Sequence, residues 1–324
     1  MKHALALSAV SLLAVGTLAA CGSDDSTSSP GGAGDGRLSV VASTNVWGDV
    51  AASVGGDLVE VTSIISDGNQ DPHGFEADAD TLLTVADADV VVANGGGYDD
   101  FVDTMVTSSK TDADVVDAFE LSGYGADEGG SEEHAEEEGH AEEEGHSHGE
   151  VNEHVWYDVP TVGKVASAIA AGLAEADPDN ATTYEANAAA LQTELDGLTA
   201  AEEQLHETVD GRPIGVTEPL PVYLASALGL VDRTPEAFSE AVEEGEDVPV
   251  AVVQEVLDQI GAGDIDLLFY NDQTTSPVTE QVRAAAEAAG VPVVPVTELL
   301  PEGEHYVSWM QGNIDAVSAA LAAA

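Results

Sequence analysis

The sequence predicts an α/β protein with two Rossmann-like lobes, each built on a parallel sheet, joined by one long rigid helix. Short runs rich in β-branched residues alternate with longer helical patterns, an order typical of parallel βαβ units. Two such sets occur, one on each side of residues 177–210, which have the spacing of a single helix. The 324 residues, 44% of them hydrophobic, suffice for one large or two ordinary domains.

The N-terminal segment, residues 1–20, is predicted to be a signal peptide, because Lys2 precedes an apolar run too short to span a membrane comfortably. The run ends in LAAC, which resembles the lipobox of bacterial lipoproteins, and its Cys21 is the only cysteine of the chain. A lipid attached to Cys21 would account for a single cysteine in an exported protein. Residues 21–36 are rich in Ser, Gly and Asp and are predicted to be a flexible tether. We therefore expect an extracytoplasmic lipoprotein anchored to the cell membrane.

Residues 37–176 form the predicted N-terminal lobe. Four short runs rich in β-branched residues indicate its strands: RLSVVAST, VEVTSII, ADVVVANGG and ADVVDAF. Residues 127–150 repeat the unit HAEEEG and contain no apolar residue larger than alanine, so we expect this loop to be disordered without a ligand. Imidazoles among carboxylates indicate a loose, weak auxiliary site for metals such as zinc, and a plain acidic spacer is the alternative. The histidines of this loop are His134, His140, His146 and His148.

Residues 177–210 are predicted to be the linker helix. Asp177 can cap it, Pro178 suits the first helical position, and leucines follow at helical spacing. Residues 211–324 form the predicted C-terminal lobe, with strand-like runs RPIGVTE, DIDLLFYN and VPVVPV. In this lobe PVTEQVRAAAEAAG indicates a crossover helix closed by Gly290.

The charge balance restricts the partners of the protein. Seven Lys and Arg residues stand against 62 Asp and Glu, a net charge of −55, which excludes nucleic acid and anionic membrane surfaces and favours cations. The same balance is typical of proteins adapted to high salt. The sequence lacks a G-x-S-x-G elbow, an H-E-x-x-H pair and a phosphate-binding loop. We therefore expect the protein not to be an enzyme.

Four residues beside predicted strand ends are candidate metal ligands. His73 follows Pro72 near the end of a strand of the first lobe, and His154 has aromatic neighbours that could exclude water. Glu218 and Glu298 directly follow strands of the second lobe. Ligands of open α/β sheets collect at the carboxyl ends of the strands, and two imidazoles with two carboxylates suit a divalent transition metal. The sequence therefore predicts a metal site in a cleft between the lobes.

The segments that carry these residues resemble the metal-binding receptors of bacterial ABC importers for zinc and manganese. The resemblance extends over nearly the whole mature chain and is most specific in DPHGFE and NEHVWYDVP. It implies that His73 and His154 are the first two ligands and that Glu218 takes the third position, which is His in typical zinc receptors and Glu in typical manganese receptors. The fourth position, commonly Asp, is here Glu298. The resemblance also implies a membrane permease with a cytoplasmic ATPase as partner, and we expect a monomer.

Two features of the sequence give opposite indications of the metal. Glu218 makes the site richer in oxygen, which favours manganese, whereas the His-rich residues 127–150 favour zinc. The general order of affinities also favours zinc, so we expect Zn²⁺ as the cargo, with Mn²⁺ as the alternative. A metal-dependent hydrolase is a second hypothesis, although four protein ligands leave little room for the open position that catalysis needs. A third is a metal-buffering adhesin that works without a transporter.

Overall fold

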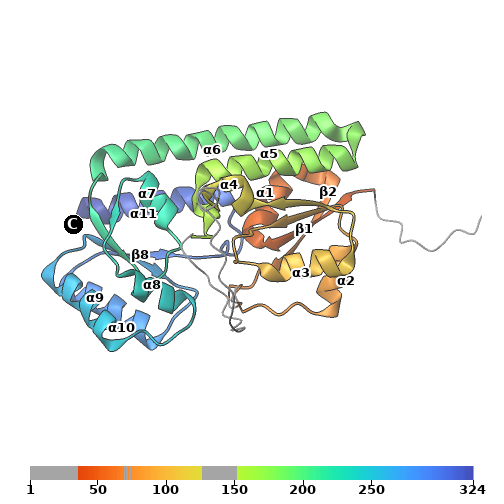
Figure 1. The fold of residues 1–324 in the computed structure, drawn as a ribbon. Coiled ribbons are helices and arrows are strands. Elements are labelled where there is room, and N and C mark those ends of the chain that lie inside the picture. The colour runs from red at the N-terminus through yellow and green to blue at the C-terminus, as the bar shows by residue number, and fades with distance from the viewer. Residues whose placement is uncertain (1–35, 69, 71, 73, 126–151, 324) are drawn as a thin grey trace, which may run out of the picture. The chain divides into compact units, whose positions relative to one another are not determined.

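Two parallel sheets form the framework of the protein. The computed structural model describes residues 36–68, 70, 72, 74–125 and 152–323. Residues Arg37–Ala324 form one compact unit that contains two four-stranded sheets, with parallel neighbouring strands and helical connections (Figure 1). The fold class predicted from the sequence, two parallel-sheet lobes and one long helix, is therefore confirmed.

The first sheet has the strand order β2-β1-β3-β4. Strand β3 is buried along its whole length, and β1 ends in a buried run. Such continuous apolar strands are typical of parallel sheets, which are covered on both faces. The elements of this part of the chain are β1 (Leu38–Thr44), α1 (Asn45–Gly55), η1 (Gly56–Leu58), β2 (Val59–Ile65), α2 (Ala79–Ala86), β3 (Val90–Ala93), α3 (Asp100–Ser109), β4 (Asp114–Asp117) and α4 (Ala118–Ser122).

The second sheet has the order β6-β5-β7-β8. Strand β6 has only two residues, too few to give a sequence pattern, and this is why it was not predicted. Helix α10 begins with a capping box of Ser276 and Thr279 and ends at Gly290, whose φ of 78° suits glycine. The elements are β5 (Pro213–Val216), α7 (Val222–Ala227), β6 (Val231–Asp232), α8 (Glu236–Glu243), α9 (Val250–Ala262), β7 (Leu267–Asn271), α10 (Pro277–Ala289), β8 (Val293–Val296) and α11 (Tyr306–Ala323).

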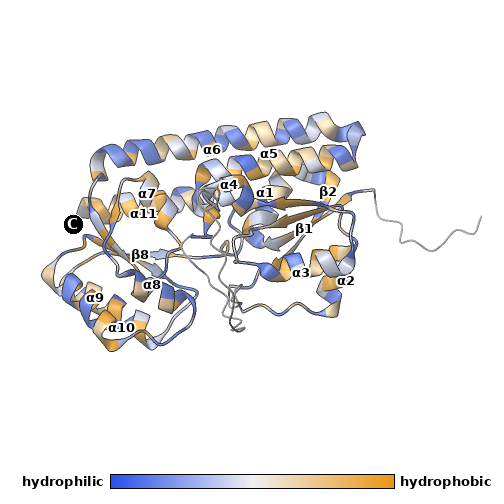
Figure 2. Ribbon diagram, viewed as in Figure 1, coloured by the Kyte–Doolittle hydropathy of each residue, from blue (hydrophilic) through white to orange (hydrophobic). Residues whose placement is uncertain are grey.

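Two long helices connect the sheets along the chain. The first, α5 (Val159–Ala176), follows the short helix η3 (Val155–Tyr157). The second, α6 (Ala181–Val209), follows the short helix η4 (Pro178–Asn180). Helix α6 has 29 residues and packs on α5, α1 and α11. Its buried leucines recur at helical spacing, so that hydrophobic and hydrophilic colours mix along it in Figure 2. Within the described part of the chain, no helix combines the length and the apolar character needed to cross a membrane.

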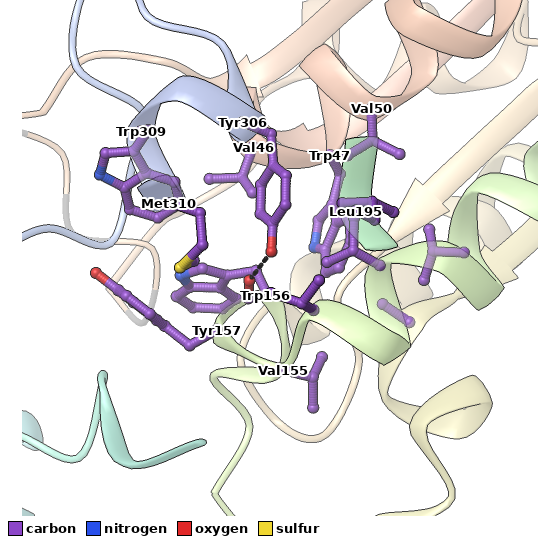
Figure 3. Packing of buried hydrophobic residues seen from close by; sticks show 14 of the residues in the cluster. Val46, Trp47, Val50, Val155, Trp156, Tyr157, Leu195, Tyr306, Trp309 and Met310 are labelled. Carbon is purple, nitrogen blue, oxygen red and sulfur yellow. Dashed lines mark hydrogen bonds between the residues drawn. The ribbon is translucent and has the colours of Figure 1, made fainter. Parts of the chain in front are cut away.

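The largest hydrophobic cluster includes residues of both sheets and of the helices between them. At its centre the aromatic side chains of Trp47, Trp156 and Tyr306 lie close to Leu195 of α6 (Figure 3). The hydroxyl of Tyr306 donates to the backbone oxygen of Trp156 at 2.8 Å. Because Trp156 lies two residues after His154, this packing fixes the backbone beside a candidate ligand.

Candidate metal centre

His154 lies at the entrance of η3 and its side chain is fully buried. Its Nδ1 lies 2.7 Å from Oδ1 of Asn152, which also accepts the backbone N–H of His154. The Asn152 amide donates in turn to the backbone oxygen of Pro219 in the second lobe, at 2.8 Å. A hydrogen bond from Nδ1–H to Asn152 favours the tautomer with the lone pair on Nε2, the arrangement found in metal-binding histidines.

The rings around His154 hold its imidazole in place. Tyr98 and Trp156 both meet it edge to face, with ring centroids 5.9 and 5.0 Å away. These contacts fix the orientation of the ring and surround it with apolar surface. Such a shell lowers the local polarity, and a charge placed beside the imidazole interacts more strongly there than in water.

Glu218 and Glu298 follow β5 and β8 at the carboxyl ends of the second sheet, and both are buried. Asn271, the last residue of β7, joins them: its Nδ2 donates to Oε2 of Glu218 at 2.7 Å and to Oε1 of Glu298 at 3.0 Å. The structure thus brings these two predicted site residues together through one amide, at the edge of the sheet where ligands of such folds collect.

Glu298 is also tied to the loop after β7 and to the first lobe. Its backbone N–H donates to Oε1 of Gln273 at 2.7 Å, and Tyr98 of the first lobe donates to its Oε2 at 3.4 Å. Tyr98 is the residue that contacts His154 through its ring. One tyrosine therefore links the imidazole of the first lobe to a carboxylate of the second.

Two carboxylates that the sequence analysis did not identify lie beside His154. Oε1 of Glu243, the last residue of α8, is 3.3 Å from Nε2 of His154. Glu153, His154 and Glu243 each offer a ligand atom, and these atoms lie within 4.8 Å of one another. Neither glutamate carries a sequence signal: Glu243 stands in the acidic run EAVEEGED, and Glu153 differs from other acidic residues only in preceding His154.

The carboxylates of this site crowd one another. The pKa of Glu243 is raised to about 9, chiefly by burial and then by the charges of Glu153, Glu218 and Glu298, in that order. Several carboxylates in a buried space are costly to ionise unless protons or a cation compensate their charge. A divalent cation bound here would do so, and the mixture of imidazole and carboxylate donors suits a transition metal.

The remaining predicted residues lie outside the described part of the chain. These are the ligand candidate His73, the lipidation candidate Cys21 and the histidines of residues 127–150, namely His134, His140, His146 and His148. Their roles stay predictions. Of the four predicted ligands, the structure describes His154, Glu218 and Glu298, and it connects all three through Tyr98 and Asn271.

Known proteins share both the sequence pattern and the fold. The family described as "Zinc-uptake complex component A periplasmic" matches residues 40–320. The manganese-binding lipoprotein MntA of Halalkalibacterium halodurans is 27% identical over 314 residues, covering 94% of this chain and 93% of its own. The manganese ABC transporter substrate-binding lipoprotein ScaA of Streptococcus gordonii is 24% identical over 334 residues, covering 96% of each chain.

The fold also matches that of solved structures. The periplasmic zinc binding protein TroA from Treponema pallidum superposes with a TM-score of 0.70 at 20% identity, covering 88% of this chain and 99% of its own. At that identity the match speaks for the architecture alone. It agrees with the two parallel sheets and the long connecting helix described above.

Proposed function

This chain belongs to the family of the zinc-uptake complex component A periplasmic proteins, and from that premise we propose that it is the substrate-binding component of an ABC importer for a divalent transition metal. The observation that carries the proposal is the buried set of His154, Glu218 and Glu298, in which Tyr98 and Asn271 link side chains of both lobes. A metal bound by both lobes would hold them in one arrangement that a permease could distinguish from the metal-free arrangement.

The proposed ligands are His73 and His154 from the first lobe and Glu218 and Glu298 from the second. Zinc remains the cargo we favour, with manganese next, because zinc binds more tightly than manganese to most sites of nitrogen and oxygen donors. The carboxylates reduce this preference, since oxygen donors suit manganese. The names of the relatives include both metals.

We further propose that the protein is held at the outer face of the cell membrane by a lipid on Cys21 and passes its metal to a permease driven by a cytoplasmic ATPase. The two relatives described above are both named lipoproteins, which supports this location. Membrane fractionation of the full chain and of Cys21→Ser tests it, and a substituted protein that stays membrane-bound contradicts the anchor. No observation favours the hydrolase or the adhesin.

Replacement of either proposed histidine ligand tests the metal site. We expect His73→Ala and His154→Ala to lose tight binding of Zn²⁺ and Mn²⁺, measured by competition with a chromophoric chelator, because each removes a nitrogen donor. His206→Ala is the matched control, since His206 lies on α6 with its side chain 44% exposed and should leave the affinity unchanged. Circular dichroism checks that each variant is folded. Unchanged affinity in folded His154→Ala would contradict the proposed site.

A further inference from the structure

The carboxylate of Glu243 has no role in the four-ligand site proposed above, yet it is directed at the same imidazole. Glu243 belongs to the second lobe and His154 to the first, and Oε1 of Glu243 lies 3.3 Å from Nε2 of His154. Nε2 is the nitrogen that the hydrogen bond at Nδ1 leaves as the metal-binding atom of the ring. Any metal bound to Nε2 would therefore lie beside this carboxylate.

The packing of α8 places Glu243 at the site. Phe238, Ser239 and Val242 form the buried face of this helix, and Phe238 and Val242 belong to the hydrophobic cluster that also holds α9 and α10. Glu243 lies four residues after Ser239, on the same side of the helix, so its side chain extends along the buried face instead of into solvent. Its side chain is only 14% exposed.

The contact between Glu243 and His154 does not satisfy the carboxylate. Oε1 of Glu243 is closed off from solvent, and no group among the residues that the structure describes donates a hydrogen bond to it. A buried carboxylate oxygen without a donor is unfavourable, because its lost interactions with water are not replaced. A metal ion would satisfy this oxygen, and the neighbouring ligand atom of Glu153 lies within 4.8 Å as well.

We propose that Glu243 is a further oxygen ligand of the bound metal and that it sets the relative affinities for manganese and zinc. This inference rests on the proposed function. With Glu243, the donor set gains one carboxylate beyond the four proposed ligands. Zinc prefers four ligands, often nitrogen or sulfur, whereas manganese suits carboxylate oxygens and larger coordination numbers. The side chain should therefore contribute more to the affinity for manganese than to that for zinc.

Substitution of Glu243 tests this proposal. We expect Glu243→Gln to weaken Mn²⁺ binding at least about tenfold and Zn²⁺ binding several times less, measured by chelator competition on the metal-free full chain. The matched control is Glu244→Gln, which makes the same change from carboxyl to amide at the exposed neighbouring residue and should leave both affinities nearly unchanged. The affinities are measured in about 0.5 M salt, because salt at this concentration screens the long-range effects of charge.

Two further measurements separate ligation from charge. Glu243→Asp keeps a carboxyl group but withdraws its oxygens from the site, so it should also weaken Mn²⁺ binding; wild-type affinity in this variant would overturn the proposal. Co²⁺ can be bound in place of the natural metal as a spectroscopic probe. Its visible absorption is stronger in a tetrahedral site than with five or six ligands. The absorption of bound Co²⁺ should therefore be stronger in Glu243→Gln than in the wild type.

The outcomes distinguish the two proposals. If His154→Ala lowers the affinity for metal while Glu243→Gln behaves like Glu244→Gln, the site stands and Glu243 is not a ligand. If the wild-type chain binds neither metal, or if His154→Ala binds both as tightly as the wild type, the proposed function itself fails. A fall in manganese affinity and a change in the Co²⁺ spectrum, both confined to the Glu243 variants, would support the fifth ligand.

Discussion

At the scale of single residues, Asn271 holds together Glu218 and Glu298, the two proposed ligands of the second lobe. Its one amide donates to Glu218 and to Glu298, and its own position is fixed because its backbone N–H donates to Oγ1 of Thr217 at 3.0 Å. Two buried carboxylates of like charge repel each other unless a donor or a cation lies between them. Asn271 supplies the donor without adding charge.

Removal of the Asn271 amide should weaken metal binding. Asn271→Ala should raise the dissociation constant for metal by roughly 10- to 100-fold, the usual effect of removing a group that orients a ligand. Chelator competition measures it. Asn187→Ala is the control, because it also removes a side-chain amide that donates to a backbone oxygen, that of Val54 at 2.9 Å, but far along α6 from the carboxylates. Equal affinities in the two variants would show that Asn271 does not orient the ligands.

At the scale of elements, α6 carries a carboxylate on its otherwise apolar buried face. Glu202 is 4% exposed, and no hydrogen-bond partner for its Oε1 is present among the described residues. Burial, with a smaller effect from the charge of Asp158, raises the pKa of Glu202 to about 7. The ordinary value is 4.5, so the folded protein binds this proton more tightly than the unfolded chain does.

The second prediction follows from this difference. The contribution of Glu202 to stability is fully present below pH 4.5 and is lost as the pH rises through about 7. Glu202→Gln should therefore be more stable than the wild type at pH 8, by at most about 3.5 kcal/mol at roughly 1.4 kcal/mol per pKa unit, and should differ little at pH 4.5. Thermal unfolding at both pH values measures the difference.

The exposed neighbour on α6 provides the control for this measurement. Glu203→Gln removes the same charge from a solvated side chain and should change the melting temperature little at either pH. Other groups that titrate in the same range affect wild type and variants alike, so the comparison isolates Glu202. A melting temperature of Glu202→Gln that stays below that of the wild type at pH 8 would contradict the assignment.

At the scale of the whole molecule, the proposed tight site and the His-rich residues 127–150 are predicted to bind metal in different ways. Three of the proposed ligands of the tight site, His154, Glu218 and Glu298, are buried in the folded protein, whereas residues 127–150 carry four histidines among many carboxylates. A protonated imidazole cannot bind a metal ion, and the ordinary pKa of a histidine side chain lies near 6.5. The two kinds of binding should therefore differ in affinity, in stoichiometry and in dependence on pH.

Removal of residues 127–150 should separate the tight binding of metal from the weak binding. Excision of residues 127–150 should leave one tight zinc site intact and abolish additional weak binding, measured by calorimetry on the intact and shortened chains. In the intact chain, the weak binding should fade between about pH 7 and 5 as the imidazoles bind protons. A stoichiometry of one zinc in both chains would identify the segment as an acidic spacer and remove the main sequence argument for zinc over manganese.

The sequence by itself determined the fold class, because the alternation of β-branched runs and helical patterns is a local property that each segment carries alone. It also singled out His154, Glu218 and Glu298, since each stands in a short motif beside a strand end or an aromatic run. His73 came from the same kind of motif but lies outside the described residues, and the metal-binding roles of all four residues remain predictions.

Only the tertiary structure decided that Glu243 belongs to the site. Among 62 acidic residues, a glutamate in an acidic run has no distinguishing local pattern. Its position depends on how Phe238 and Val242 pack α8 into the second lobe and on the contact of that lobe with His154 in the first. The same holds for Asn271, which becomes significant only because two strand ends meet beside it. Contacts between residues far apart in the sequence arise from the packing of whole elements, and no single segment encodes them.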